Sequence, residues 1–308
     1  MGALTGRVAV VAGATRGAGR GIACALGEAG ATVYCTGRSV RGRPSSFGRP
    51  ETVDETAELV SAAGGVGIAV QVDHTEPERV RALFDRVDHE QEGRLDLLVN
   101  DMSGNDQLDR GMFSDQDRRP FWENDPEVDL LALDVGIGAH FTTSHYAARL
   151  MIKNRRGLIV EIGDGNFVGY NNAGVAYSLM RTSAVVLGHL LAEELRPYEV
   201  AAVSLTPGFL RSEEMLEALS VTEDTWRDNL APGDHFANSE SPLYIGRAVV
   251  ALATDSQVLA RTGHALSAGF LAREYGFTDT DGSQPPGYRP ESRFQDGLFT
   301  HATPSCQN

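Results

Sequence analysis

Cysteine and basic residues are scarce in this sequence, and each shortage excludes a class of protein. Three cysteines occur in 308 residues, Cys24, Cys35 and Cys306, without the C-x-x-C spacing of metal or redox sites, so neither a zinc site nor a disulfide framework is expected. Lysine and arginine together number 27 against 42 aspartates and glutamates, a net charge of −15. Proteins that bind nucleic acids or lipid surfaces need basic surface to meet phosphates, so neither partner is expected.

Long apolar runs are also missing. No apolar run approaches the roughly 20 residues that a membrane span requires, and the first run reaches a glycine-rich turn too early for a signal peptide. Cys24 and Cys35 lie in apolar segments, which is typical of buried thiols in a reducing compartment. We therefore expect a cytoplasmic protein. The composition, 42% hydrophobic and 22% charged, predicts one large folded domain.

The sequence does contain a regular alternation of short apolar runs with longer segments of helical period. Residues 76–91 show the helical period, because Val80, Leu83, Phe84 and Val87 form one apolar stripe. Such alternation predicts an α/β fold of the Rossmann type, with a doubly wound parallel sheet in a single domain. The expected strands are 7–12, 32–36, 67–72, 95–100, 157–163, 200–206 and 264–268.

Three segments depart from this alternation. Residues 103–126 form a polar insert whose large apolar side chains either cover a substrate or fill the core. Residues 209–240 combine a short amphipathic helix with polar loop, and we predict that they form a mobile substrate lid. Residues 275–308 are rich in proline and glycine, which predicts an irregular tail after a domain of residues 1–274. The apolar side chains of the insert are Met112, Phe113, Phe121 and Trp122.

A glycine-rich turn, "AGATRGAGRGIA", directly follows the first expected strand. Gly13, Gly17 and Gly19 lead from it into a helix. Glycines at such a turn let the backbone approach a pyrophosphate, which then faces the free amides at the helix N-terminus. Because the turn has a strand before it and a helix after it, we interpret it as a nucleotide site in preference to a plain glycine-rich turn.

The end of the second strand, "YCTGRS", bears on the choice of cofactor. An enzyme that uses NAD usually has an acidic residue here for the ribose hydroxyls, but this chain has Gly37. Arg38 follows at once, and Arg16 lies in the glycine turn. Two guanidinium groups can hold a 2′-phosphate through charge-assisted hydrogen bonds. We therefore expect NADP(H), unless these arginines are only solvated surface residues.

The order of these motifs resembles the short-chain dehydrogenase/reductase family over about residues 5–270. The glycine turn, "VDHT" at 72–75, "LLVN" at 97–100, Tyr177 and "TPGFLRS" at 206–212 carry the resemblance. It implies a seven-stranded parallel sheet, a small-molecule substrate, and dimers or tetramers that pair helices around 127–154 and 174–196. It also implies cofactor contacts from Gly13, Thr15, Arg16, Gly17, Ala18, Gly19, Arg38, Ser39, Asp73, His74, Asn100, Tyr177, Arg181, Pro207, Gly208 and Ser212.

Three further segments resemble one branch of that family. They are "PFWE" at 120–123, "VGIGAHF" at 135–141 and "YGFTDTDGS" at 275–283. The branch includes mammalian dehydrogenase/reductase member 1 and many actinobacterial proteins. Its members have varied substrates, so the resemblance implies no particular one.

The catalytic positions depart from the family pattern of asparagine, serine, tyrosine and lysine. Tyr177 matches the tyrosine, but Asp164 replaces the serine, Arg181 the lysine and Gly136 the asparagine. An arginine keeps the positive charge near the phenol but is always protonated and relays protons poorly. Tyr177 and Arg181, four residues apart, share one helix face, as either a catalytic or a packing pair.

Asp164 is the replacement with the largest chemical consequence. An ionised carboxylate only accepts hydrogen bonds and opposes the alkoxide that ketone reduction develops. Three alternatives reconcile it with catalysis: a protonated carboxyl, a pair with Arg181 or another cation, or a cationic substrate such as an iminium. Asp164 is alternatively a turn residue with no chemical role.

Three functions follow from these residues. The first is an NADPH-dependent oxidoreductase that uses Tyr177, Arg181 and Asp164 on a carbonyl or imine carbon. The second is a non-redox enzyme that cyclises, isomerises or dehydrates a metabolite, and the third is a non-catalytic NADP(H)-binding protein. His140, His145 and His189 lack partners at metal-ligand spacing, so we expect packing or surface roles for them and no bound metal.

Overall fold

The described part of the chain forms one parallel sheet. The computed structural model describes residues 2–43, 48–104, 120–163, 174–228, 230 and 234–287. Its seven strands run in the order β3-β2-β1-β4-β5-β6-β7, and all neighbours are parallel. The strands are β1 (Val8–Ala12), β2 (Thr32–Gly37), β3 (Val66–Gln71), β4 (Leu97–Asn100), β5 (Gly157–Ile162), β6 (Val200–Thr206) and β7 (Ala265–Ser267). The expected Rossmann-type sheet is confirmed, and every expected strand is present.

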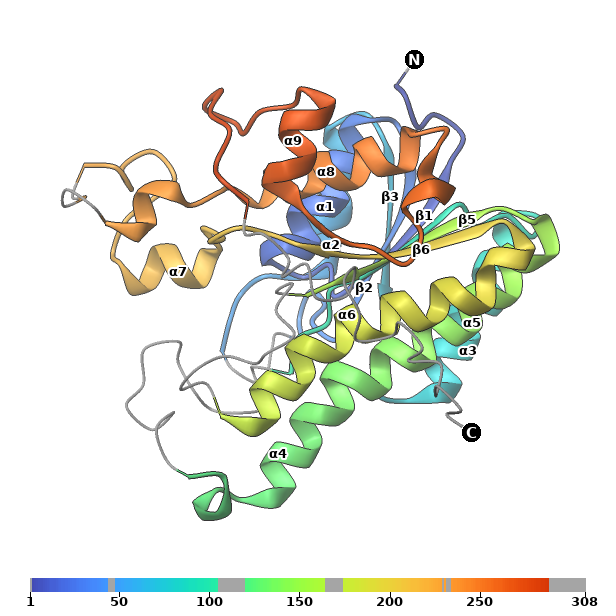
Figure 1. The fold of residues 1–308 in the computed structure, drawn as a ribbon, viewed down its shortest axis with the longest axis horizontal. Helices are drawn as coiled ribbons and strands as arrows, with labels where there is room; N and C mark the ends of the chain where they lie inside the picture. Colours follow the sequence, from blue (N-terminus) through green and yellow to red (C-terminus); the bar gives the residue numbers. More distant parts are fainter. Residues whose placement is uncertain are drawn as a thin grey trace, which may run out of the picture.

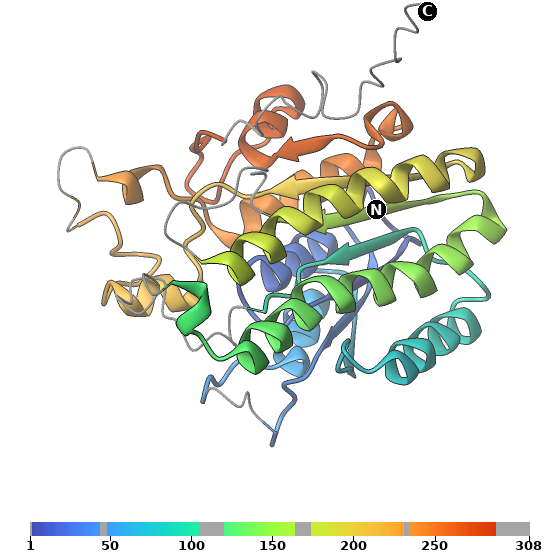
Figure 2. The same cartoon turned by 60° about the horizontal axis from the view of Figure 1, so that its bottom comes forward.

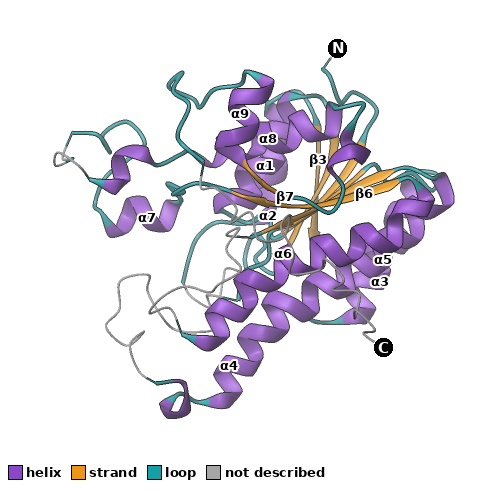
Figure 3. Ribbon diagram, viewed as in Figure 1, coloured by secondary structure: helices purple, strands orange, loops and turns teal. Residues whose placement is uncertain are grey.

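Helices cover both faces of the sheet (Figures 1 and 3). On one face, α1, α2, α8 and α9 enclose an apolar core, and on the other α3, α5 and α6 enclose a second core. The helices are α1 (Gly17–Glu28), α2 (Val53–Ala62), α3 (Pro77–Glu90), α4 (Pro126–Leu133), α5 (Ala139–Asn154), α6 (Val175–Leu195), α7 (Glu213–Ala218), α8 (Pro242–Thr254) and α9 (Ala268–Tyr275). Short 3₁₀ turns lie at Phe121–Glu123, Arg196–Tyr198, His235–Asn238 and Val258–Arg261, and a π-helical turn spans Asp134–Gly138.

Helix α3 shows how the pattern of the sequence produces the fold. Its proline lies in the first turn, where no backbone hydrogen bond is lost. The expected apolar stripe, Val80, Leu83, Phe84 and Val87, is buried. Each such side chain contributes about 1.5 to 3 kcal/mol by leaving water, so the stripe determines which face of the helix meets the sheet.

The strand order places a crossover between β1 and β4. From β1 the chain proceeds outward to β2 and β3 and then returns to β4 on the other side of β1. The last residues of these strands, Ala12 and Asn100, are register partners. Ligands of doubly wound sheets bind where the connections diverge in this way, beyond the carboxyl ends of the strands. This edge, called the carboxyl edge below, is where the expected site residues should meet.

Helix α6 is the longest helix of the described residues and requires a correction. The stretch Val175–Tyr198, with 24 residues and a mean hydropathy of 1.3, is long and apolar enough to cross a membrane by length and composition. Our expectation that no apolar run reaches this length is therefore wrong for this helix. Length and composition alone are weak grounds for a membrane span, because core helices pass the same test, and α6 packs on β5 and β6.

Candidate functional site

The glycine turn after β1 has a geometry that requires glycine. Gly13 and Gly17 have φ values of 90° and 57°, in the left-handed region that side chains disfavour. A Cβ atom on Gly13 would lie 2.6 Å from the carbonyl oxygen of Asp101, and one on Gly19 would lie 2.2 Å from the carbonyl oxygen of Gly13. The turn therefore packs tightly on the residue that follows β4, and Ala18 is buried beneath it.

The end of β2 lies against this glycine turn. A Cβ atom on Gly37 would lie 2.7 Å from Thr15 Oγ1 and 3.1 Å from Val53 Cγ1. An acidic side chain at position 37 thus cannot be placed unless Thr15 moves. Arg16 follows Thr15 and Arg38 follows Gly37, so both arginines lie at the carboxyl edge of the sheet. Arg38 is exposed.

His74, expected near an adenine, instead has its side chain in the core. Its Nε2 lies 2.8 Å from Thr36 Oγ1 and its Nδ1 lies 2.9 Å from Thr143 Oγ1. Burial lowers the pKa of His74 to about 3, so the ring is neutral and connects β2 to α5. Asp73 accepts hydrogen bonds from the backbone and hydroxyl of Thr75. An adenine contact at this place would therefore come from Asp73 or from backbone atoms.

A buried polar network that the sequence analysis did not identify lies behind the carboxyl edge. Glu161 of β5 is completely buried. Its Oε1 accepts from Asn100 Nδ2 at 2.9 Å and from the Ser144 hydroxyl at 2.8 Å. Its Oε2 lies 2.7 Å from His140 Nδ1, and His140 Nε2 lies 2.8 Å from the Met102 carbonyl oxygen. The network thus connects β4, β5 and α5 beneath the turn that carries Met102.

Both ring nitrogens of His140 face acceptor atoms, so the proton count of the pair is constrained. A carbonyl oxygen can only accept, hence Nε2 carries a proton, and a second proton lies between Nδ1 and Glu161 Oε2. Burial lowers the pKa of His140, but the hydrogen bond and the negative charge of Glu161 outweigh it, and the pKa is raised. The packing role expected for His140 is therefore that of a buried ion pair. The glutamate in the apolar run "GLIVEIG" was the signal for it.

Tyr177 and Arg181 lie together on α6. The guanidinium carbon of Arg181 is 5.4 Å from the centre of the Tyr177 ring, and both side chains are half-buried. Gly163, the residue after β5, packs against the same turn, because a Cβ atom there would lie 3.3 Å from the Arg181 carbonyl oxygen. Asp164 lies outside the described residues.

The position of the family asparagine is closed by a side chain of α6. Gly136 lies in the π-helical turn between α4 and α5. A Cβ atom on it would lie 2.7 Å from Met180 Cγ and 2.8 Å from Met180 Sδ. An asparagine could occupy this position only if Met180 moved. The replacement of the asparagine is therefore coupled to the residue between Tyr177 and Arg181.

The segment after β6 is anchored by a buried glutamate. The amide of Gly208, which follows Pro207, donates to Glu240 Oε2 at 2.8 Å, and Glu240 is fully buried. Burial raises the pKa of Glu240 to about 8. Its Oε1 has no hydrogen-bond partner within the described ranges. Ser212 caps α7 by accepting from the Met215 amide at 3.4 Å.

The described residues between 209 and 240 lie beside the sheet (Figure 2). Their small apolar cluster is built on Met215, Trp226 and Phe236. The buried guanidinium of Arg211 lies 4.1 Å from the Trp226 ring and 2.7 Å from Glu223. Two backbone hydrogen bonds of 2.8 Å join the ends of the segment, where Glu240 and Leu210 form an isolated β-bridge.

In the insert 103–126, Phe121 and Trp122 are exposed by 57% and 72% and do not fill the core. Met112 and Phe113 lie outside the described residues.

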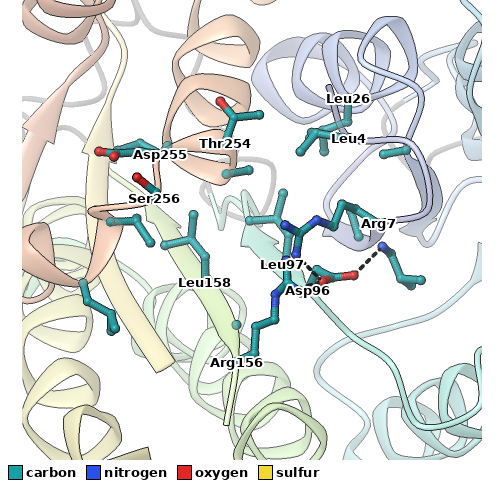
Figure 4. A pocket seen from close by; sticks show the side chains of 18 of the residues that line it. Leu4, Arg7, Leu26, Asp96, Leu97, Arg156, Leu158, Thr254, Asp255 and Ser256 are labelled. Atoms are coloured by element: carbon teal, nitrogen blue, oxygen red, sulfur yellow. Dashed lines mark hydrogen bonds and ion pairs between the residues drawn. The ribbon is translucent and has the colours of Figure 1, made fainter. Parts of the chain in front are cut away.

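A separate cavity of about 360 Å³ lies at the opposite edge of the sheet (Figure 4). Arg7, Asp96 and Gly157, beside or at the first residues of β1, β4 and β5, line it, together with Leu158 and Leu252. Arg7 Nη1 is 2.8 Å from Asp96 Oδ1. Because the glycine turn leaves the other end of β1, this cavity is not the nucleotide site.

Comparison with known proteins agrees with this geometry. Residues 7–224 match the family model described as short chain dehydrogenase. The mouse protein dehydrogenase/reductase SDR family member 1 is 37% identical over 287 residues, which cover 92% of this chain and 87% of the mouse protein. This confirms the resemblance to that branch.

Solved structures share the fold. A protein from Xanthomonas campestris has a TM-score of 0.72 at 22% identity, covering 92% of this chain and 94% of its own. A metagenomic short-chain oxidoreductase in complex with NADP has a TM-score of 0.63 at 25% identity, covering 86% of this chain and 96% of its own. The family model spans most of the sheet, and the mouse relative aligns along nearly the whole chain. We therefore conclude that this protein is an oxidoreductase of the short-chain dehydrogenase/reductase family.

Proposed function

We propose that this protein is an NADP(H)-dependent reductase that acts on a carbonyl or imine carbon of a small metabolite. The contact between Thr15 and Gly37 carries the cofactor assignment. A side chain at position 37, such as an acidic one that would repel a 2′-phosphate, would fit only if Thr15 moved, and the contact brings the backbones of Arg16 and Arg38 to one edge. The similar metagenomic oxidoreductase, solved with NADP, supports the same choice.

The residues of α6 suit the protonation half of the reaction. When bound, the reduced nicotinamide supplies a hydride to the carbon. Tyr177 donates its phenolic proton to the oxygen or nitrogen of the substrate, so that a carbonyl becomes an alcohol and an imine an amine. Arg181, beside the Tyr177 ring, holds the nicotinamide ribose and favours the phenolate that remains. The turn of Pro207 and Gly208, with the Ser212 hydroxyl, holds the nicotinamide.

Asp164 determines the type of substrate within this proposal. A carboxylate at the serine position stabilises a positively charged carbon–nitrogen double bond and destabilises an alkoxide. We therefore favour an imine over a simple ketone, unless Asp164 is protonated or pairs with a cation.

A specific observation favours a second function. Met180 fills the space beside Gly136, so no polar side chain extends from that position toward the α6 residues. This loss is compatible with a non-redox enzyme of the same fold or with an NADP(H)-binding protein without catalysis. Turnover measurements separate these functions from the reductase.

Cofactor preference is the first test. NADPH should bind more tightly than NADH, and Arg38→Asp should erase or reverse the preference. A lost charge-assisted pair costs about 1.5 to 3 kcal/mol, or about ten-fold to a hundred-fold in affinity. Calorimetric titration measures both cofactors, with Arg86→Asp on the distant helix α3 as the control. Equal affinities of the parent for the two cofactors would contradict the assignment.

Turnover is the second test. Tyr177→Phe should lower the turnover of an imine or ketone by about 10²- to 10⁴-fold while NADPH binding stays nearly intact. The double variant Asp164→Ser with Arg181→Lys restores two family residues, so it should raise ketone reduction and lower imine reduction. The loss of nicotinamide absorbance measures both. NADPH binding by parent and variant without turnover of any substrate would instead establish the binding protein.

We also propose a homodimer or homotetramer in the cytoplasm. Large apolar side chains on the outer faces of α4, α5 and α6 support the assembly, among them Leu130, Phe141, Leu179 and Leu190. A second copy that packs the same helices against them would remove this surface from water. The free thiols of Cys24 and Cys35 support a reducing compartment.

A further inference from the structure

The amide at the start of helix α1 is held by a carboxylate from the lid. The N–H of Gly17 donates to Glu213 Oε2 at 2.8 Å, although the two residues are 196 positions apart. Glu213 Oε1 also lies 3.9 Å from Arg20 Nε. Glu213 is the first residue of α7. The lid therefore places a negative charge directly on the glycine turn.

This contact lies where a nucleotide phosphate would bind. The first amides of a helix have no partners within the helix and carry its positive dipole. An anionic oxygen is the group that such an amide prefers, and a carboxylate and a phosphate compete for it on equal geometric terms. Ser212 Cβ also lies 3.9 Å from the position of a Cβ on Gly17. The N-terminal end of α7 therefore covers the turn.

A second ion pair holds α7 over the turn. Arg49 Nη1 lies 2.8 Å from Glu217 on α7, and its Nη2 lies 2.7 Å from Glu51. Arg49 and Glu51 lie in the segment between β2 and α2. The lid is thus closed by two carboxylates of one short helix, and only Glu213 uses a backbone amide of the turn.

We propose that Glu213 is an internal competitor for the pyrophosphate of the cofactor and so limits its affinity. This inference rests on the proposed binding of NADP(H) at the glycine turn. Binding requires that the carboxylate leave Gly17, because two anions cannot share one amide and repel each other at this distance. The lid must therefore move at its α7 end whenever the cofactor enters or leaves.

The test is a substitution that improves binding. Glu213→Gln keeps the size of the side chain and removes its charge, so NADPH should bind roughly ten-fold more tightly than to the parent. Glu214→Gln is the matched control, because Glu214 lies next to Glu213, carries the same charge and is exposed. The affinity of this control variant for NADPH should equal that of the parent. Calorimetric titration of the whole chain measures all three proteins.

A truncated ligand locates the effect. Adenosine 2′-phosphate keeps the phosphate expected to meet Arg16 and Arg38 but has no phosphate at the 5′ position. Its affinity should be the same for the parent and for Glu213→Gln. An equal gain for both ligands would show that the change acts away from the pyrophosphate and would overturn the inference.

The remaining outcomes separate this inference from the proposed function. Unchanged or weaker NADPH binding by Glu213→Gln, with a parent that binds NADPH, overturns the inference alone. Absence of NADPH binding by the parent and by the variant overturns both. Tighter binding by Glu213→Gln only, with adenosine 2′-phosphate unaffected, establishes the competition.

Discussion

At the scale of single residues, His140 and Glu161 form a buried pair of titratable groups. Glu161 accepts three hydrogen bonds inside the core, and one of them comes from a histidine whose other nitrogen is already committed to Met102. A buried pair of this kind is expensive to break, because one partner alone is left as an uncompensated charge. Its position beneath the turn after β4 means that its state determines where that backbone lies.

Replacing Glu161 should reverse the pH dependence of the stability that His140 contributes. In the parent, Glu161 holds the pKa of His140 above its usual 6.5, so the pair contributes stability that is fully present below pH 6.5 and is lost as the pH rises. In Glu161→Gln the hydrogen bond and the negative charge of Glu161 are gone, so burial, the largest cause, lowers the pKa of His140 against the smaller opposing effects of the Met102 carbonyl and Asp101. The contribution is then present above pH 6.5 and lost as the pH falls. The difference between the melting temperatures of the two proteins, measured from pH 5 to 8, should therefore grow toward acid.

The corresponding control is Glu28→Gln at the exposed end of α1. Its melting temperature should follow that of the parent across the same range. A Glu161→Gln protein whose melting temperature stays parallel to that of the parent would contradict the buried pair.

At the scale of elements, the helices and strands differ in how far the sequence predicts them. The parallel strands and α3 follow from their apolar periodicity, because burial on a sheet imposes that period directly. The π-helical turn Asp134–Gly138 does not, since "DVGIG" has two glycines in five residues and too few large side chains to show a change of period. Its consequence, Met180 against Gly136, is a contact between separate helices that no local pattern encodes.

The candidate site likewise contains features that the sequence predicts and contacts that it does not. The glycine turn and the pair of Tyr177 and Arg181 were predictable, because each lies within a few consecutive residues. The contact of Glu213 with Gly17 was not, since it joins two residues far apart in the chain through the path of the lid. The core position of the His74 side chain was also missed, because a strand end exposes or buries a side chain according to its neighbours in the sheet.

The contact of Glu240 with the Gly208 amide should respond to pH. Burial raises the pKa of this carboxyl from 4.5 to about 8. The folded state therefore holds a proton that the unfolded chain releases, and the stabilising contribution is present below pH 4.5 and falls as the pH rises toward 8. Glu240→Gln keeps the acceptor for the Gly208 amide and cannot ionise. Relative to the parent, its free energy of unfolding should rise between pH 5 and 8, by on the order of 4 kcal/mol.

Other charged and titratable groups face this carboxyl and are part of the test. Asp279 raises the pKa of Glu240, Arg211 lowers it, and Tyr244 senses the same charge. Urea unfolding at several pH values measures the difference. An unchanged gap between parent and variant from pH 5 to 8 would mean that Glu240 is already ionised.

At the scale of the whole molecule, the two sides of the sheet are unequal in their exposure. The helices α5 and α6 run side by side (Figure 2), and only 33% of the apolar window within Val175–Tyr198 is buried inside this single chain. Apolar surface of this extent usually marks an interface. The proposed contact with a second copy would account for the apolar composition of α6 without a membrane.

A charge on that surface should dissociate the assembly. Leu190→Glu places a carboxylate at a position that is 52% exposed in the single chain, so the fold should be retained, whereas burial of the charge in an interface is unfavourable. Sedimentation velocity should show a smaller species for this variant than for the parent. Leu59→Glu, on the opposite side of the sheet and 42% exposed, should leave the sedimentation coefficient unchanged. Identical coefficients for the parent and for Leu190→Glu would contradict the interface.

The neighbouring ends of the segment 209–240 have a consequence for its tolerance to change. The chain leaves the domain at Phe209 and returns at Glu240 through one pair of neighbouring backbone hydrogen bonds, and the segment between them has its own apolar cluster. A segment with adjacent ends can be lengthened, shortened or exchanged at little entropic cost to the domain that carries it. Changes of length within this segment should therefore leave the sheet and the glycine turn in place.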